Sequence, residues 1–514
     1  MSDLTSEAPP KLGPDGQPSP PAPSRRPAGG WWRRLGEVAG VLVAACLLAA
    51  AIVLVPPSTL LIGLVGLVLI GAIAMYPAFG IYLLLGATPL LAGIDRGMAI
   101  PVLRPSEALL VLVGVGLLVR GVVRTASGSF RRPTLDTLDR SLLLLAFTSS
   151  VVPVLWLLLR GRQLEQDDVL YSLMMWKYYG IYLVAKVSVQ TRRQVRRCLF
   201  VAMATASIVA VIAIFQSLQL FGVARALQAY YSPYGDTGAV LNNRGGSTLS
   251  LPIAVADLMT INLAIAVGFL VRSRRHRGPL LAMGVLFVTG VLASGQFSGA
   301  IGLVLGIVVL TVITRRVREV AVFVPVLIAV GFFLLRPVIE QRLEGFSSAS
   351  GLPESWDGRI YNLTNYFFPQ LFSHGNFLLG VQPAARVPTS TMSLGYIWIE
   401  SGYTWLLWSG GIPLLFAFLW FLWVGLRRHL RLARRADVVG VAATAVVVTL
   451  ILVGVLMAID PHLTYRGAAD MLFALLGLVA ALRHADEGDV RRPHPTDVRN
   501  LRHRRVVSLS WRPS

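Results

Sequence analysis

The sequence predicts an all-α membrane protein, a polytopic bundle of about 14 transmembrane helices. Apolar runs of about 20 residues recur along the chain, and each is long enough to cross a hydrocarbon core of roughly 30 Å as a helix. Of the 514 residues, 55% are hydrophobic and only 14% are charged, whereas a soluble domain carries about 25% charged residues. The runs do not alternate apolar and polar positions, which excludes a transmembrane β-barrel.

Two polar tails flank the predicted bundle. Residues 1–36 are rich in Pro, Ser and Gly, which is typical of a disordered cytoplasmic segment. A signal peptide is not expected, because it would need an apolar segment near the start. Residues 37–483 form the transmembrane domain, and residues 484–514 form a basic cytoplasmic tail. The predicted spans are 37–55, 59–78, 79–95, 106–123, 141–159, 169–188, 198–219, 251–271, 279–294, 295–313, 320–336, 403–425, 437–458 and 467–483.

The basic residues predict the orientation of this bundle. The formal net charge is +21, and cationic loops that orient helices explain it better than binding to nucleic acid. With a cytoplasmic N-terminus and alternating spans, 34 of the 47 lysines and arginines lie inside, eleven lie outside, and Lys177 and Lys186 lie within a span. This bias favours a multi-pass protein with both termini in the cytoplasm. The eleven outer residues are Arg96, Arg104, Arg160, Arg162, Arg225, Arg244, Arg336, Arg342, Arg359, Arg386 and Arg466.

Two predicted outer segments are long, residues 221–251 and 337–397. The second is a large extracytoplasmic loop between the eleventh and twelfth spans. Its apolar residues recur at helical spacing, which is typical of an amphipathic helix on the membrane surface. We therefore expect this loop to cover the outer end of the bundle.

The outer arginines are the first candidates for a binding site. Arg244 directly precedes the span at 251, and Arg359 lies in the large loop. A guanidinium matches phosphate geometry with two parallel donors and keeps its charge in a semi-dry site. Several converging arginines would stabilise a diphosphate leaving group, although any single one is also explained as a solvated loop residue.

Two residues are candidates for a general base. Glu400 lies just before the span at 403 among aromatic side chains, where desolvation should raise its pKa; alternatively, it stabilises the positive end of the helix dipole. His374 in the large loop could accept a proton or bind phosphate, or could simply be exposed. Asp460, His462 and Arg466 cluster in the last outer loop, where they could bind a headgroup.

Other mechanisms have no motif in this sequence. Neither a phosphate-binding GxxxxGK[ST] loop nor an HExxH motif occurs. Cys46 and Cys198 belong to no Cys/His cluster. We therefore expect no metal, no cofactor and no disulfide.

Several segments occur in an order that resembles a known family. They are "YPAFGIYLLLGATPLLAGIDRG", "NNRGGSTLSLPIAVADLMTINLAIAV", "LASGQFSGAIGLVLG", "GRIYNLTNYFFPQLFSHGNFLLGVQP" and "ESGYTWLLWSGGIPLL". Together they are similar to the O-antigen ligase and O-antigen polymerase superfamily of bacterial membrane glycosyltransferases. The resemblance covers roughly residues 38 to 483.

The resemblance implies a location, a reaction and a set of site residues. The location is the bacterial cytoplasmic (inner) membrane. The reaction is metal-free transfer of a glycan from an undecaprenyl-diphosphate carrier to an acceptor hydroxyl outside. Arg244 and Arg359 correspond to diphosphate-binding arginines, and Glu400 stands where the family has a His or Asp base. The family's Ser-Arg-Gly is "QFSG" here, so Gln296 could donate hydrogen bonds but not charge.

The leading hypothesis is therefore a polysaccharide-assembly glycosyltransferase, either ligase or polymerase. Its partners would be a polyprenyl-diphosphate-linked glycan, membrane lipid and other polysaccharide-assembly proteins. Tyr403, Gln296 and Arg466 are candidate contacts to the acceptor or headgroup. One alternative is a polysaccharide or lipid-carrier transporter without covalent chemistry; its charged residues would lie near the midplane of the membrane. Another is a membrane scaffold for an assembly complex.

Overall fold

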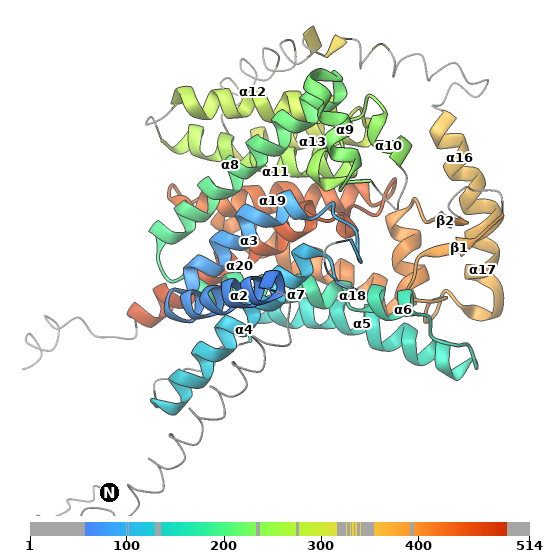
Figure 1. Ribbon diagram of the computed structural model, residues 1–514, viewed down its shortest axis with the longest axis horizontal. Coiled ribbons are helices and arrows are strands. Elements are labelled where there is room, and N and C mark those ends of the chain that lie inside the picture. The colour runs from blue at the N-terminus through green and yellow to red at the C-terminus, as the bar shows by residue number, and fades with distance from the viewer. Residues whose placement is uncertain are drawn as a thin grey trace, which may run out of the picture. The chain divides into compact units, whose positions relative to one another are not determined.

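The computed structural model describes residues 57–98, 102–128, 135–232, 237–273, 277–315, 354–390 and 395–490, with residue 100 and isolated positions between 325 and 340. The chain divides into two compact units, Met1–Val68 and Leu69–Ser514. The second unit holds the helical core and both sites described below. Its main helices are α3 (Pro77–Leu91), α4 (Pro105–Ala126), α5 (Thr137–Leu159), α7 (Met174–Ser188), α8 (Arg192–Ser217), α11 (Pro252–Arg272), α12 (Arg277–Ala293), α13 (Phe297–Thr314), α18 (Gly402–Leu432), α19 (Val438–Leu456) and α20 (Ala468–Val490) (Figure 1). Helix α2 (Pro57–Met75) crosses the boundary between the two units.

Seven of the described helices are long and apolar enough to cross a membrane: α4, α5, α8, α11, α13, α18 and α19. Shorter apolar helical stretches lie in α2, α3, α12 and α20. The predicted helical fold is therefore confirmed, with seven described helices that suit a membrane by length and composition, whereas fourteen complete crossings are not established. The predicted span 37–55 lies outside the described residues, and so does the span 320–336 apart from isolated positions.

Local sequence explains where many of these helices begin. Pro77, Pro105 and Pro252 each occupy a first helical position, where the missing backbone N–H would be unpaired in any case. Asp136 caps α5 by accepting hydrogen bonds from the backbone N–H groups of Leu138 and Asp139. These residues set the positions at which the helices start, and thereby the positions of the site residues next to them.

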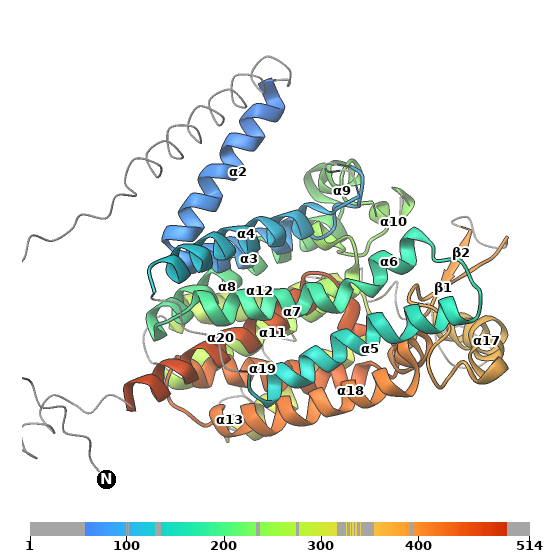
Figure 2. The ribbon, with the colours of Figure 1, turned by 90° about the horizontal axis from the view of Figure 1, so that it is seen from below.

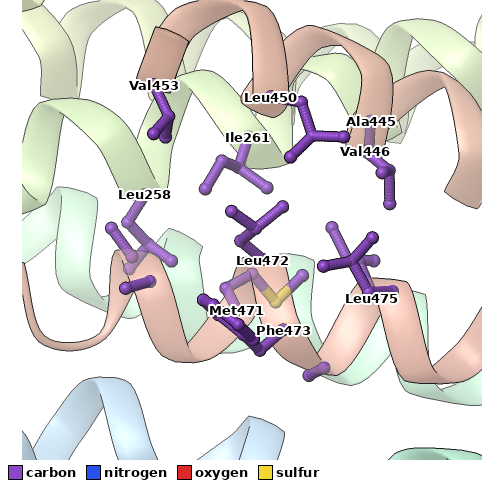
Figure 3. Packing of buried hydrophobic residues seen from close by; sticks show 14 of the residues in the cluster. Leu258, Ile261, Ala445, Val446, Leu450, Val453, Met471, Leu472, Phe473 and Leu475 are labelled. Atoms are coloured by element: carbon purple, nitrogen blue, oxygen red, sulfur yellow. The ribbon is translucent and has the colours of Figure 1, made fainter. Parts of the chain in front are cut away.

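The core of the unit lies where α11, α19 and α20 meet. Figure 3 shows Leu258 and Ile261 of α11 facing Leu450 and Val453 of α19, with Leu472 of α20 between them. All five are at most 6% exposed. Small residues bring neighbouring backbones together, as at Gly477 of α20, where an added Cβ would collide with the carbonyl oxygen of Tyr182 in α7.

The predicted span 169–188 is not one helix. It consists of α6 (Gln166–Ser172) and α7, which part at Leu173. Asp168 of α6 accepts a hydrogen bond from the Ala384 backbone N–H at 3.1 Å, and Asp167 forms an ion pair with Arg386. Helix α6 therefore contacts the large loop and does not form one continuous helix with α7.

The large loop is folded where it is described. It contains α16 (Glu354–Asn362), the π-helix η4 (Leu363–Phe367), α17 (Phe368–Phe372), the turn η5 (Ser373–Gly375) and an antiparallel pair, β1 (Arg386–Pro388) and β2 (Tyr396–Trp398), with Val387 opposite Ile397. The helical part is amphipathic: Phe367 and Leu371 are buried, and Ile360 is 52% exposed. Phe367 packs edge-on against Trp408 of α18 with ring centroids 5.1 Å apart, so the loop is packed onto the bundle.

Candidate functional site

A cavity of about 650 Å³ lies among segments that are far apart in the sequence. Its wall comes from the start of α4, the α6–α7 junction, the loop before α11, α16, the β2–α18 junction and the loop between α19 and α20. Six basic side chains line it, against three carboxylates. The basic residues are Arg96, Arg104, Lys177, Arg244, Arg359 and Arg466, and the acidic ones are Glu107, Glu400 and Asp460.

A tightly held loop positions Arg244. Gly245 donates its backbone N–H to the Ala293 carbonyl oxygen at 2.9 Å, and a Cβ at Gly245 would lie 2.7 Å from the Ala213 carbonyl oxygen of α8. Only glycine permits this approach. Ser247 follows, with its backbone N–H bonded to the Gln216 side chain at 2.7 Å. Arg244 itself is half-buried, and no ion pair joins it to a carboxylate of the described residues.

Arg359 lies between two carboxylates. Its Nη1 is 3.0 Å from Oδ2 of Asp460, and its Nε is 3.8 Å from Oε2 of Glu400. The Asp460 side chain is 4% exposed and that of Glu400 is 40% exposed. Arg359 therefore links α16 to the loop after α19 and holds Glu400 at the cavity wall.

The environment of Glu400 favours a proton acceptor. Burial raises its pKa above the ordinary value, the nearby Arg359 guanidinium acts in the opposite direction, and the negative charge of Asp460 raises it further. A carboxylate with a raised pKa is a stronger base toward a hydroxyl group than an ordinary glutamate. Its side chain is 40% exposed and also lines the cavity, where a bound hydroxyl group could reach it.

A second group of arginines lines the same cavity. Arg96 pairs with Glu107 at 2.9 Å, and Arg104 lies 3.4 Å from the same carboxylate. Arg466 reaches the Ala92 carbonyl oxygen at 3.2 Å and Asp95 at 3.5 Å. Burial, together with the positive charges of Arg466 and Arg96, lowers the pKa of Arg104 to about 10. An anion in the cavity would relieve this crowding of positive charge.

Lys177 and several aromatic rings complete the wall. Lys177 of α7 pairs with Asp470 of α20 at 2.8 Å, and its Nζ lies 4.5 Å from the centre of the Tyr178 ring. Trp176, Trp398 and Trp405 also line the cavity. Aromatic faces of this kind can stack on the apolar faces of sugars or pack against lipid.

The structure brings most of the predicted site residues together. Arg244, Gln296, Arg359, Glu400 and Arg466 all line the one cavity. Gln296 is the N-cap residue of α13 but makes no capping hydrogen bond through its side chain.

Three residues singled out in the sequence lie elsewhere. His374 is exposed on the turn η5 and is not among the residues that line the cavity. Tyr403 donates its hydroxyl to the Gly454 carbonyl oxygen at 2.6 Å and so connects α18 to α19. His462 is buried against Asp257 of α11 at 2.7 Å, so it does not share the cavity with its neighbour Asp460.

Sequence reasoning missed part of the wall. In the sequence Arg96 and Arg104 are marked only as outer arginines, whereas Lys177 is a charge within a span that can either extend to the interface or face a cleft. The two arginines share one signal, a positive charge retained on the side where the positive-inside bias depletes it. The five cavity arginines all come from segments that the count places outside.

No group of three or more His, Cys, Asp or Glu side chains is arranged to hold a metal ion among the described residues. A scan against protein-family models finds no match, and searches of curated proteins and of solved structures find no significant match either.

Proposed function

We propose that the chain is a membrane glycosyltransferase that moves a glycan from an undecaprenyl-diphosphate carrier to an acceptor hydroxyl, as ligase or polymerase. The observation that carries the proposal is the cavity in which six basic side chains surround one open carboxylate, Glu400. Basic side chains suit a diphosphate and the carboxylate suits a hydroxyl. The motif order that resembles the O-antigen ligase and polymerase superfamily supports the same reaction.

In this proposal Arg244 is the main contact to the diphosphate, because it carries no described carboxylate partner. Glu400 takes the proton as the acceptor oxygen attacks the anomeric carbon. The bond between that carbon and the phosphate oxygen breaks, and the diphosphate leaves with its electron pair. Positive charge placed beforehand stabilises this developing negative charge. Arg359 has a second role, since it holds Glu400 in position.

The test measures glycan transfer in proteoliposomes with a lipid-diphosphate-linked donor. Arg244→Gln should lower the rate roughly 100-fold, the usual cost of removing one such donor, and Arg244→Lys should lie between that variant and the wild type. Arg162→Gln and Arg225→Gln are matched controls, because both are exposed outer arginines that do not line the cavity. Equal rates in all variants at normal expression would reject the proposal.

Transport of a lipid-linked glycan is a second candidate, favoured by the charged pairs on α7. Lys186 lies against Asp139 and Lys177 against Asp470, and all four side chains are at most 13% exposed. Buried charges within membrane helices are typical of transport pathways. Movement of a labelled lipid-linked glycan across the bilayer, without a covalent product, would favour the transporter.

A further inference from the structure

A second hollow lies at the other end of α18. It measures about 740 Å³ and is lined by the start of α5 and the last turns of α18, two helices that run side by side (Figure 2). Glu400 directly precedes the first turn of the 31-residue α18. Because α18 is kinked at Gly411, a rise of about 1.5 Å per residue gives an upper limit of roughly 40 Å for the separation between Glu400 and the centre of the hollow. The two sites belong to opposite ends of the bundle.

The lining residues of α18 form one stripe in which aromatic side chains precede arginines. Trp420, Trp423, Arg427 and Arg431 are spaced by three, four and four residues, so they share one face of the helix. Arg427 and Arg431 follow Trp423 in steps of four residues, each about 6 Å along the helix axis toward the helix end. Tryptophan is typical of the depth where acyl chains meet headgroups, and arginine of the headgroup level.

The charge in this hollow is largely unpaired. Arg140, Arg427 and Arg431 line it and are exposed, and no described carboxylate forms an ion pair with any of them. Arg428 is 11% exposed and pairs with Asp136, the only acidic lining residue. Its Nε and Nη2 are buried and have no hydrogen-bond partner among the described residues. The hollow therefore holds four guanidinium groups but only one carboxylate, and this excess of positive charge favours the binding of an anion.

The pairing with Asp136 does not cancel this surplus. Burial alone would raise the pKa of Asp136, but Arg428 and hydrogen bonds from Asp139 lower it to about 2. Asp136 is therefore ionised throughout the physiological range and neutralises one arginine only. Three positive charges remain, and the single negative charge of a phosphodiester would neutralise part of this excess. The flanking Leu135, Trp420, Trp423 and Val424 suit the acyl chain attached to such a group.

We infer that this hollow binds an anionic phospholipid, with its phosphate among Arg140, Arg427, Arg428 and Arg431 and an acyl chain along Trp420 and Trp423. Basic pockets between transmembrane helices, at the side rich in basic residues, are known to suit such headgroups. The lipid would join the ends of α5 and α18. This inference is independent of the reaction proposed for the cavity.

Native mass spectrometry of the full chain in detergent provides the test. The protein is titrated with phosphatidylglycerol, with phosphatidylcholine, and with glycerol phosphate as a soluble probe without acyl chains. The variant Arg140→Gln/Arg427→Gln/Arg431→Gln removes the exposed arginines but retains Arg428, which holds α5 to α18. The matched control, Arg193→Gln/Arg277→Gln/Arg315→Gln, removes the same charge from exposed residues that do not line the hollow.

We expect the wild type and the control variant to bind phosphatidylglycerol at least 10-fold more tightly than phosphatidylcholine. The hollow variant should lose that preference with an unchanged thermal unfolding midpoint. Trp423→Ser should weaken phosphatidylglycerol binding several-fold, because the acyl chain loses its contact. Equal losses in the hollow and control variants would overturn the inference, and so would equally tight binding of glycerol phosphate, which would assign the hollow to a soluble phosphate.

Discussion

Replacing Lys186 by methionine should destabilise the bundle strongly. Lys186 Nζ lies 2.8 and 2.7 Å from the two carboxylate oxygens of Asp139, whose side chain is 0% exposed. Methionine has a similar length but no charge, so Lys186→Met leaves the carboxylate buried without its counter-ion. The perturbation therefore isolates the loss of one charge within α7.

The structure sets the size of this effect. Removing one partner of a buried ion pair costs about 3–5 kcal/mol. Asp139 retains hydrogen bonds from the Tyr182 hydroxyl at 2.8 Å and the Asp136 backbone N–H at 2.6 Å, so we expect about 3 kcal/mol, at the lower end of that range. The double variant Lys186→Met/Asp139→Asn carries no buried charge and keeps an acceptor oxygen, so it should recover about 2 kcal/mol.

Thermal unfolding in detergent measures both variants. The control is Arg192→Met, which breaks a pair with Asp437 whose side chains are 53% and 26% exposed and should cost less than about 1 kcal/mol. If Lys186→Met unfolds at the wild-type temperature, or the double variant is as unstable as the single one, the buried pair does not stabilise the bundle by the expected amount.

Three further predictions concern the cavity and the large loop. Glu400→Gln should slow glycan transfer by about 100-fold. Burial raises the pKa of Glu400 above its ordinary value of 4.5, so the wild-type rate should fall as the pH decreases through that raised pKa. A pH–rate profile without this fall at acidic pH would contradict the role of Glu400 as a base. His374→Ala should leave the transfer rate within about two-fold, since an exposed side chain outside the cavity makes no contact with substrate; a larger loss would restore His374 as a candidate base. Gly411→Ala should lower the unfolding free energy by at least about 2 kcal/mol, because Gly411 has φ +66 within α18 and a Cβ there would collide with the Leu378 carbonyl oxygen; an unchanged unfolding midpoint would show that the loop can move away.

Composition and the length of the apolar runs predicted the helical fold, because each apolar helix can be recognised from its own stretch of sequence. The break at Leu173 was not predictable in this way. The stretch around it, "LYSLMMWKYYG", contains no proline and remains apolar, and α6 is set apart by contacts of Asp167 and Asp168 with residues more than 200 positions later. Pairings over such separations leave no local signal.

Part of the candidate site was predictable, because the sequence shows where charged residues lie along the chain but not which of them come together. Arg244 and Glu400 are charged residues that directly precede predicted spans, Arg359 is a charge within the large loop, and all three line the cavity. Arg104 also precedes a span, but its proximity to Arg466 depends on packing against the other end of the chain. His374 was the second candidate base after Glu400, yet it is exposed on the turn η5 and is not among the residues that line the cavity. Which polar residues converge is decided by packing.

In the proposed reaction, the excess of basic over acidic groups on the cavity wall would affect turnover. Six basic groups and three carboxylates leave a formal surplus of three positive charges. A polyprenyl diphosphate that has lost its sugar has one more ionisable oxygen than the sugar-linked donor. The wall would therefore retain the spent carrier more firmly than the fresh one, and carrier departure would limit the catalytic cycle. Inhibition by free undecaprenyl diphosphate below the donor KM checks this, and weaker inhibition would contradict it. In that case the arginines that promote bond cleavage would also delay the next round.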